Sequence, residues 1–417
     1  MLSGPVGVGL GIIVSAIKFP LYIHFLGYEK YGVWLLLSTI LTFAQMGSLG
    51  IGPAIVKLVA EEYEQNNHKA ILEYIMTAVC MLMVSGVVIV VTSILFKAQI
   101  IFVLGLKGDN AELADSLLIY MVIFSIGVLA YQVLNSVLAG IGRFDIANYS
   151  QTALQIIPLP IAIPLLLSGK GVVSVFLANV FAYLVIFFLN LMRVNRTVNL
   201  KRMDISFCSM QRFKMMITFG STVFLGYMFN MIIVPITKIA ITKSIGVEGV
   251  PVFELAYRVS MQIRSMFQVA LKALMPEISK LSSGQSQESA IKMKKIITKA
   301  NSLLLLGAIP LYILVFMFAG LIFKIWLGTD FIPSFPSVFR VMLLASCISL
   351  MGVIPYYIFM GRGLTKKILF HHIIQAGCTL LLVGSAITFM PDINLISISW
   401  CFVAGAVFGT GYLLLAR

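Results

Sequence analysis

Long apolar stretches alternate with short polar connectors along almost the whole chain. Each stretch has eighteen or more residues with few charges, enough for an α-helix to cross the roughly 30 Å hydrocarbon core of a bilayer. The longest polar connectors are only about 194–214 and 277–296. The pattern predicts an all-α polytopic membrane protein with twelve spans, at 3–26, 31–58, 70–96, 114–139, 144–168, 171–193, 215–242, 250–276, 297–323, 337–360, 367–390 and 393–416.

Parts of the chain occur twice. The peptide Pro53-Ala54-Ile55-Val56-Lys57-Leu58 returns 223 residues later as Pro276-Glu277-Ile278-Ser279-Lys280-Leu281, with four of six residues identical. Two shorter peptides return 219 residues later: Leu26-Gly27-Tyr28-Glu29 as Ile245-Gly246-Val247-Glu248, and Ile141-Gly142-Arg143 as Met360-Gly361-Arg362. A chain made of two similar halves is typical of transporters.

The repeat predicts the domain organisation. Six spans per half is an even number, so both halves enter the membrane in the same sense and form parallel repeats about an axis along the membrane normal. We expect an N-terminal six-helix bundle at 1–193, a cytoplasmic linker at 194–214 and a C-terminal six-helix bundle at 215–417, with a central cavity between the bundles.

The net charge of +14 is explained mainly by Lys and Arg in the connectors, whose distribution indicates the orientation in the membrane. With the N-terminus inside, eighteen Lys and Arg fall in the inner connectors and C-terminus, and six in the outer loops. The positive-inside rule then predicts that both termini are cytoplasmic. This distribution argues against a nucleic-acid role. The first residues lack the basic start and cleavage site of a signal peptide. The five cysteines lack metal-ligand spacing, and no metal or cofactor is expected.

Apart from the cations at span ends that are counted with the connectors, six fall inside predicted spans: Lys18, Lys238, Arg258, Arg264, Lys272 and Arg340. A Lys or Arg at mid-bilayer costs about 2.5–3.5 kcal/mol even on the lenient insertion scale. Side chains near a span end can place the charged group at the interface, which accounts for Arg340 and Lys272 and nearly as well for Lys238. Arg264 lies about twelve residues from either end, too deep for this.

The eighth span carries a polar stripe. Its members are spaced 4, 4, 3, 3 and 4 residues apart, so they share one helix face: Glu254, Arg258, Gln262, Ser265, Gln268 and Lys272. The repeat copy places Thr39, Thr42 and Gln45 at matching positions. Lipid does not tolerate such a stripe, so it faces protein or water. We interpret it as a cavity lining, with ordinary helix–helix hydrogen bonding as the alternative.

The chemistry of the expected cavity is cationic. Glu254 is the carboxylate that lies furthest inside a predicted span, because Glu73, Asp115 and Asp145 lie at span starts, and its i,i+4 spacing to Arg258 allows a local pair. The interior then stays strongly positive, which attracts anions and repels cations. An Arg guanidinium suits phosphate because its planar fork binds two oxygens.

One region resembles a known family. The stretch Leu26-Gly27-Tyr28-Glu29-Lys30-Tyr31-Gly32-Val33-Trp34, followed by Gly47-Ser48-Leu49-Gly50-Ile51-Gly52-Pro53-Ala54-Ile55 and Val59-Ala60-Glu61, resembles the opening of bacterial O-antigen and polysaccharide flippases. That family has an "LGxxxYGxW" turn before a "DLGIGxAI" element. Ser48 stands where the family usually has Asp. The family belongs with the multidrug/oligosaccharidyl-lipid/polysaccharide exporters, whose members have a MATE-like arrangement of two six-helix lobes around a cavity.

The resemblance implies a function. The family moves undecaprenyl-diphosphate-linked oligosaccharides, the repeat units of O-antigen, capsule or exopolysaccharide, from the inner to the outer leaflet of the bacterial inner membrane by alternating access. The implied partners are this lipid-linked oligosaccharide, the lipid bilayer and a polysaccharide polymerase or chain-length machinery. The residues expected to line the cavity and bind the substrate are Arg264, Arg258, Lys18, Lys238, Lys272, Gln262, Gln268, Gln45 and Glu254.

Two other functions remain open on the sequence alone. A cation-coupled multidrug antiporter of the same superfamily would need carboxylates deep in the membrane, and the first half has carboxylates only at the starts of its spans. A membrane polysaccharide polymerase would be expected to carry acid/base groups on a large outer loop. The longest outer loop, about 97–113, has only Asp109 and Glu112. A purely structural scaffold leaves the cationic stripe unexplained.

Overall fold

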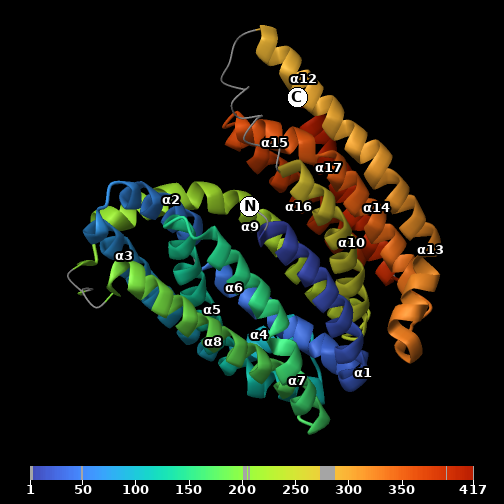
Figure 1. Ribbon diagram of the computed structural model, residues 1–417. Helices are drawn as coiled ribbons and strands as arrows, with labels where there is room; N and C mark the ends of the chain where they lie inside the picture. The colour runs from blue at the N-terminus through green and yellow to red at the C-terminus, as the bar shows by residue number, and fades with distance from the viewer. Residues whose placement is uncertain are drawn as a thin grey trace. The chain divides into compact units, whose positions relative to one another are not determined.

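The structure is a computed structural model that describes residues 3–47, 50–200, 204, 207–272, 287–390 and 392–416 (Figure 1). Throughout these ranges the secondary structure is helical, and no strand occurs. The all-α prediction is therefore confirmed. The chain forms two compact units, Met1–Met228 (unit 1) and Phe229–Arg417 (unit 2). The bundle boundaries expected at 193 and 215 stay a prediction, whereas the boundary between the compact units lies further along the chain, within one helix.

Ten helical stretches in the described ranges are long and apolar enough to cross a membrane. One of them, Gly9–Met46, contains most of the first predicted span and the first part of the second, whose remainder lies in the next helix, Ile51–Glu64. The two spans are separated by a kink, because Gly27 adopts the non-helical angles φ 69° and ψ 169° inside helix α1 (Ser3–Met46). The predicted eighth span is helix α10 (Gly249–Lys272), which is not among the ten. Its polar stripe lowers its hydropathy below that of the other spans.

Unit 1 is organised around one buried helix, α5 (Asp109–Gly140), which packs against α1, α2, α3, α6 and α8. The bounds of these neighbours are Ile51–Glu64 for α2, His68–Leu95 for α3, Phe144–Ile156 for α6 and Val172–Val198 for α8. Two short helices complete the unit: α4 (Lys97–Leu104) follows α3 along the chain, and α7 (Pro158–Leu167) follows α6. The apolar core joins α2, α3 and α5, with Ile55, Ile71 and Val137 fully buried. The fifth predicted span is divided into α6 and α7 at Ile157, directly before Pro158, because proline cannot donate a backbone hydrogen bond.

Two glycines near the N-terminus permit close helix packing. A Cβ on Gly7 would lie 2.7 Å from Thr152 Oγ1, and one on Gly11 would lie 2.3 Å from Gln155 Oε1. Helix α1 packs against α6 at these positions, and Figure 1 shows the two helices as neighbours. Gly9 faces open space instead.

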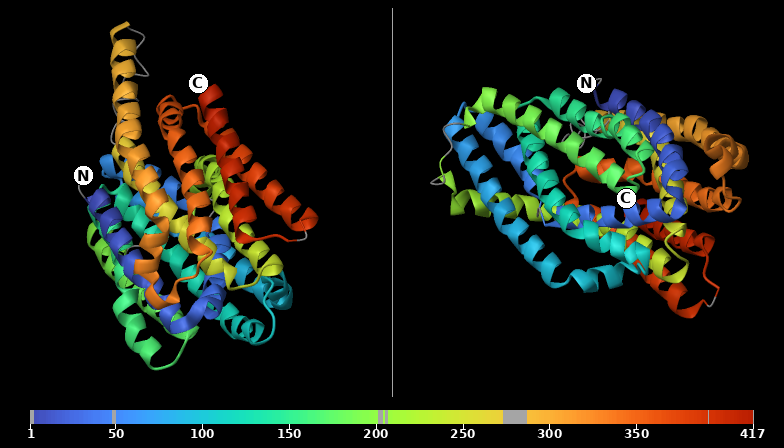
Figure 2. Two further views of the ribbon diagram at one scale, coloured as in Figure 1. Left: turned by 90° about the vertical axis from the view of Figure 1, so that its right-hand side faces the viewer. Right: turned by 90° about the horizontal axis from the view of Figure 1, so that it is seen from below.

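Unit 2 is organised around α14 (Phe335–Met351), which packs against α10, α13 (Ile309–Leu327) and α17 (Leu395–Leu415). Helix α16 (Thr365–Phe389) lies beside α17, and the views of Figures 1 and 2 agree on this. Helix α15 (Val353–Gly361) follows α14, and α12 (Gln287–Leu303) precedes α13 through the π-helical turn η3 (Leu304–Ala308). A short 3-10 turn, η4 (Gly328–Asp330), ends this run.

The two units repeat each other in structure as well as in sequence. The most buried spans are α5 in unit 1 and α14–α15 in unit 2, which occupy corresponding places in the two halves. Gly27 and its counterpart Gly246 both have positive φ, 69° and 129°. Both positions therefore need a backbone conformation that glycine adopts without strain.

One repeat landmark shifts by two residues in the structure. Gly142 has φ 82° and ends α5, whereas the residue with the same role after α15 is Gly363, with φ 70°, rather than Gly361. The turn bonds agree, because Arg143 N donates to Leu138 O and Leu364 N donates to Phe359 O. The correct offset here is 221, so the alignment of Gly142 with Gly361 is wrong. The repeat peptide 276–281 lies outside the described residues, as does Ser48.

Helix α9 (Met210–Ser244) links the two units as one continuous helix that passes through Pro235. Its first part, up to Met228, belongs to unit 1, and the rest belongs to unit 2. Gly220 in the first part approaches α2 so closely that a Cβ on Gly50 would lie 2.2 Å from Gly220 O. This contact explains why the compact unit extends beyond the predicted linker.

Candidate functional site

Three of the expected cavity residues come together in unit 2 as a charged triad. Lys238, from α9, lies 2.9 Å from one carboxylate oxygen of Glu254, in the first turns of α10. Arg258 Nε donates to the other oxygen, one helical turn further on. The pairing of Glu254 with Arg258 was predicted from their spacing, whereas the contact with Lys238 was not. Two cations and one carboxylate leave the triad with a net charge of +1.

Burial differs sharply within the triad. The side chains of Lys238 and Glu254 are only 5% and 2% exposed, whereas that of Arg258 is 52% exposed. A buried carboxylate is stable only when charged partners compensate for its lost hydration. Lys238 supplies that compensation from within the protein, and Arg258 keeps part of its guanidinium at the surface of the unit.

Arg264 occupies the middle of α10, where no carboxylate compensates its charge. Its Nη1 lies 3.9 Å from Met261 Sδ, a weak contact within the same helix. Its Nε is buried and has no hydrogen-bond partner. Among the residues the structure describes, no Asp or Glu forms an ion pair with Arg264. Buried polar groups are almost always satisfied, so such a guanidinium marks a place where water or a ligand belongs.

Aromatic hydroxyl groups surround Arg264. Its charge interacts with the hydroxyls of Tyr257 on α10, Tyr312 on α13, and the adjacent Tyr356 and Tyr357 on α15. Tyr312 accepts a hydrogen bond from Ser346 at 3.1 Å. Tyr312 and Tyr357 are each only 5% exposed. Sequence reasoning missed these four residues, although tyrosines deep within otherwise apolar spans were a usable signal.

Two histidines belong to the same cluster. His371 and His372 on α16 are buried and lie within range of the charge of Arg264. The rings of both stack edge-on against Tyr356, at 6.3 and 5.9 Å between centroids. A nitrogen of His371 lies 2.9 Å from the carbonyl of Gly409 on α17. Adjacent histidines at the start of a span were the sequence signal for this part of the site.

The rest of the polar stripe on α10 is held mainly by backbone groups. Ser265 donates to the carbonyl of Gln262 at 2.7 Å. The carbonyl of Gln268 accepts from the hydroxyl of Tyr357 at 3.4 Å. The side chains of Gln262 and Gln268 are half-buried. Lys272 is the last residue of α10, and its side chain lies outside the described part of the chain.

Two expected cavity residues lie in unit 1. Lys18 is half-buried on α1, with its ammonium 5.9 Å from the ring of Phe19 and 6.0 Å from that of Tyr22. Gln45 is half-buried near the end of the same helix. The two residues are more than seven helical turns apart along α1, so they do not form one local site.

A second arginine cluster, in unit 1, was not predicted. Arg212, in the first turn of α9, donates to Glu73 at 3.0 Å, to Glu62 at 3.1 Å and to the hydroxyl of Tyr74 at 2.9 Å. Its guanidinium also lies 4.6 Å above the Tyr74 ring. Burial alone would lower the pKa of Arg212, but the hydrogen bonds to Glu73 and Tyr74 and the charge of Glu62 raise this pKa above its usual value.

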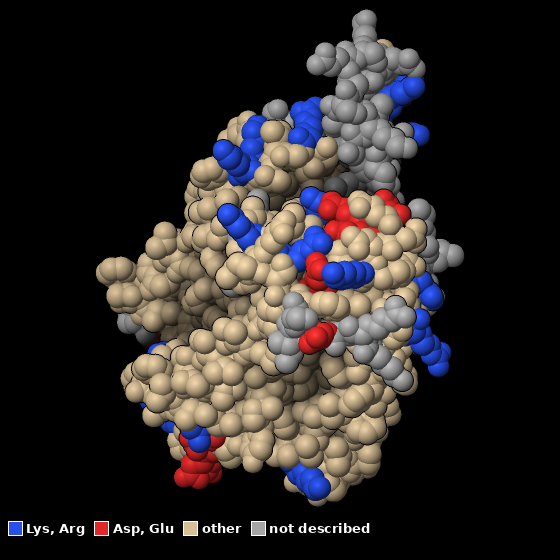
Figure 3. Space-filling view, turned by 90° about the vertical axis from the view of Figure 1, so that its left-hand side faces the viewer, with Lys and Arg blue, Asp and Glu red and all other residues tan. Residues whose placement is uncertain are grey.

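Most of the face in Figure 3 consists of uncharged side chains. The charged residues form small groups, with uncharged surface between one group and the next. Within the described ranges, no group of three His, Cys, Asp or Glu side chains comes together as metal ligands would. The site in unit 2 is therefore best described as a buried cation among hydroxyl and imidazole groups. Such a site offers hydrogen-bond donors and positive charge to an anion.

Fold and site together define a class: a multi-pass helical membrane protein with two repeated units and buried intramembrane cations. The profile of the family described as "Polysaccharide biosynthesis protein" matches residues 24–336, three quarters of the chain. The chain belongs to this family. It is also 20% identical over 349 residues to a Shigella flexneri protein assigned as an O-antigen transporter, covering 82% of this chain and 79% of that protein.

Solved structures show the same fold. The lipid II flippase MurJ, in an inward closed conformation, aligns with a TM-score of 0.76 at 15% identity, covering 100% of this chain and 86% of MurJ. An inward-facing MATE-family multidrug resistance transporter of the MOP superfamily aligns with a TM-score of 0.74 at 18% identity, covering 99% and 94%. The flippase resemblance and the MATE-like fold predicted from the sequence are confirmed. Family and fold together are those of a membrane transporter.

Proposed function

We propose that this protein is a flippase that moves an undecaprenyl-diphosphate-linked oligosaccharide from the inner to the outer leaflet of the bacterial inner membrane. The family match and the O-antigen transporter relative support a polysaccharide-related cargo. A diphosphate with attached sugars is polar and anionic, whereas its polyprenyl tail can stay in lipid. The protein then needs to shelter only the polar part.

The buried guanidinium of Arg264 carries this proposal. It is held at mid-helix on α10 with no carboxylate partner among the described residues, and its Nε has no hydrogen-bond partner. A diphosphate oxygen would supply both the missing negative charge and the missing acceptor. The neighbouring hydroxyl of Tyr312, which accepts from Ser346, is a suitable donor to a further phosphate oxygen.

The remaining polar residues take supporting roles. Arg258 keeps half of its side chain exposed, so its guanidinium is available for a second phosphate contact beyond Glu254. Lys238, Lys18 and Lys272 add positive charge. The amides of Gln45, Gln262 and Gln268 would hydrogen-bond sugar hydroxyls. Glu254 anchors Lys238 and Arg258 and does not contact the anion.

Transport would proceed by alternating access, through rocking of the two bundles around a central cavity with both chain ends in the cytoplasm. The membrane potential favours outward movement of negative charge by about 2.3 kcal/mol per charge per 100 mV. The oligosaccharide would then reach a polysaccharide polymerase or chain-length machinery on the outer side of the membrane.

Because the fold is similar to that of a MATE-family transporter, a cation-coupled multidrug antiporter is the alternative function. Such a protein needs an intramembrane carboxylate that is accessible to protons, sodium or cationic drugs. Glu254 in unit 2 is 1% exposed and already bound to two cations. This arrangement favours an anionic cargo over a cationic one.

The proposal is tested by Arg264→Ala in proteoliposomes loaded with a fluorescent undecaprenyl-diphosphate oligosaccharide. We expect translocation to fall about 30-fold or more, because losing a buried charge contact costs about 2 kcal/mol or more. Arg340→Ala is the matched control. Arg340 is a partly exposed span arginine that donates to the carbonyl of Phe316 at 3.1 Å, and its removal should leave translocation unchanged. Undiminished flipping by the Arg264 variant would overturn the proposal.

A further inference from the structure

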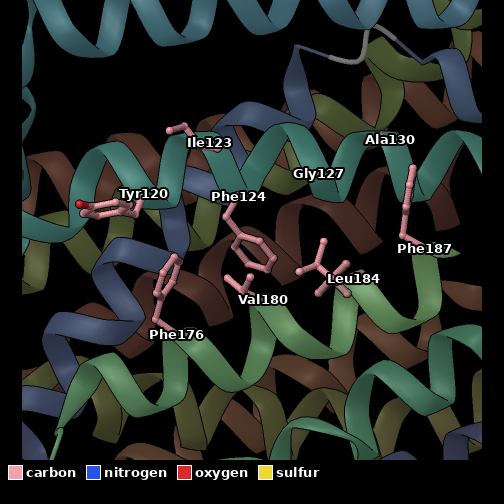
Figure 4. A pocket seen from close by; sticks show the side chains of 10 residues that line it. Tyr120, Ile123, Phe124, Gly127, Ala130, Phe176, Val180, Leu184 and Phe187 are labelled. Carbon is pink, nitrogen blue, oxygen red and sulfur yellow. The ribbon is translucent and has the colours of Figure 1, made fainter.

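Unit 1 contains an apolar groove that plays no part in the charged site. The groove lies between α5 and α8 and has a volume of about 420 Å³ (Figure 4). Phe124, Val180 and Leu184 point into it, and Phe176 and Phe187 lie on the α8 side. Its lining has almost no polar surface, so hydrocarbon is the chemistry it fits.

Small residues on α5 create the recess. Gly127 lies at the middle of the α5 wall, and a Cβ placed on it would meet nothing within 4 Å. Ala130 follows one turn later, opposite Phe187 in Figure 4. Packing between aromatic rings joins the α5 wall to the α8 wall. The ring of Phe124 packs edge-on against those of Phe176 and Tyr183, with 5.9 and 5.3 Å between centroids. The recess is therefore bounded by rigid aromatic groups.

The groove opens on an exposed apolar surface of unit 1. Tyr120 and Ile123 at its margin on α5 are 60% and 55% exposed, and Leu184 on α8 is 51% exposed. Phe181 and Phe188, on the same helix, are also more than half exposed. Both helices are long and apolar enough to cross a membrane. A hydrocarbon chain can thus enter sideways from the bilayer.

Depth decides which hydrocarbon chain fits. The groove runs along α5 from Tyr120 to Ala130, about 15 Å at 1.5 Å per residue. On α8 its residues lie on both sides of Ala182, the midpoint of the apolar segment 172–192. The groove is therefore centred on the bilayer midplane. Each leaflet is about 15 Å thick, so a phospholipid acyl chain from one leaflet would reach only half of the groove.

We propose that the α5–α8 groove binds a segment of the polyprenyl tail of the cargo, a proposal that rests on the proposed function. An eleven-unit prenyl chain is much longer than one leaflet and can pass the midplane while its diphosphate is sheltered elsewhere. Holding the tail in unit 1 would keep the cargo attached to the protein while its polar part moves. The groove thereby recognises the lipid and leaves the glycan free to vary.

The test is photo-crosslinking of the full-length protein in lipid nanodiscs. One probe is a polyprenyl diphosphate with a photoreactive group in its tail, and the other is a phospholipid with the same group in its acyl chain. We expect the prenyl probe to label α5 and α8, and unlabelled undecaprenyl diphosphate to compete. Equal labelling of α5 and α8 by the phospholipid probe without such competition would show a plain lipid site and overturn the proposal, as would an α5–α5 crosslink between two copies that blocks the groove.

Gly127→Leu fills the groove and is expected to lower prenyl labelling about tenfold, because the hydrocarbon loses its buried surface. Gly384→Leu on α16 is the matched control, since a Cβ there also meets nothing within 4 Å. It should label as the wild type does. Competition on the wild-type protein decides the question even if the filled variant does not fold. Labelling of the groove without any translocation would refute the flippase function alone, and translocation with prenyl labels elsewhere would refute the groove alone.

Discussion

Two arginines in this protein have opposite surroundings. Arg212 in unit 1 donates to two carboxylates and a tyrosine hydroxyl, all from helices α2 and α3. Arg264 in unit 2 has hydroxyl and imidazole groups around it but no carboxylate partner among the described residues. The hydrogen-bond partners of Arg212 are protein groups, so its side chain holds the start of α9 against α2 and α3. Arg264 has interactions left to offer to a ligand.

The triad of Lys238, Glu254 and Arg258 lies between these two extremes. One oxygen of its carboxylate contacts the buried Lys238, and the other accepts from Arg258, whose side chain is half exposed. The comparison teaches that positive charge inside a membrane protein has two separate uses. Carboxylate partners indicate a structural use, and missing ones indicate an anion site.

The largest expected effect on stability follows from Glu254→Leu. This change leaves Lys238 buried without its counter-ion, and breaking a buried pair costs about 3–5 kcal/mol. We expect the free energy of unfolding, measured by denaturant titration in mixed micelles, to fall by that amount. Glu248→Gln, on an exposed carboxylate just before α10, is the control and should change little.

Removing both charges tests the cause of that loss. The double variant Glu254→Leu, Lys238→Met takes the cation away together with its partner, so most of the lost stability should return. A double variant as unstable as Glu254→Leu would mean that packing around the carboxylate, and not its charge, supports the fold.

Arg212→Leu comes next in size. The two hydrogen bonds to carboxylates and the one to Tyr74 disappear, and Glu62 and Glu73 lose the cation between them, but Arg212, Glu62 and Glu73 all retain some solvent contact. We expect a loss of about 1–3 kcal/mol in the free energy of unfolding. Arg196→Leu, on an exposed arginine in the last turn of α8, serves as the matched control. A loss no larger than that of the control would remove the structural role given to Arg212.

Lys57→Met is expected to have a smaller effect. The ammonium of Lys57 lies 4.5 Å from the ring centroid of Phe219, which adds one contact between α2 and α9. An exposed cation–π contact contributes about 0.5–1 kcal/mol. Thermal unfolding in detergent should resolve this loss against Lys69→Met, an exposed lysine in the first turn of α3.

The pattern of hydrophobic and polar residues along the chain predicted most of the fold. Within the described residues the predicted spans fall on helices, because a backbone in lipid must satisfy its own hydrogen bonds, although the first two spans share α1 and the ninth runs from α12 through η3 into α13. The pattern did not reveal where the compact units divide. That boundary depends on long-range contacts such as Gly50 with Gly220 and Arg212 with Glu73, which no local periodicity encodes.

The candidate site was predicted in its residues along α10 and in Lys238, but not in the contacts between helices. The spacing of Glu254, Arg258 and Arg264 on α10 follows directly from helix geometry. Lys238 and Tyr357 come from other helices, and only packing brings them to α10. The groove on α5 and α8 was also invisible in the sequence, because a recess depends on the side chains of two helices together.

Arg264→Leu should change stability least and transport most. A guanidinium at mid-membrane costs about 2.5–3.5 kcal/mol, and no carboxylate in the described chain offsets that cost. Its replacement by Leu should therefore leave the free energy of unfolding within about 1 kcal/mol of the wild type or raise it. The same denaturant titration in mixed micelles measures this change beside the translocation assay. Removing a side chain that has no counter-ion should not destabilise the fold. A loss of stability as large as that of Arg212→Leu would therefore show that Arg264 has a structural role.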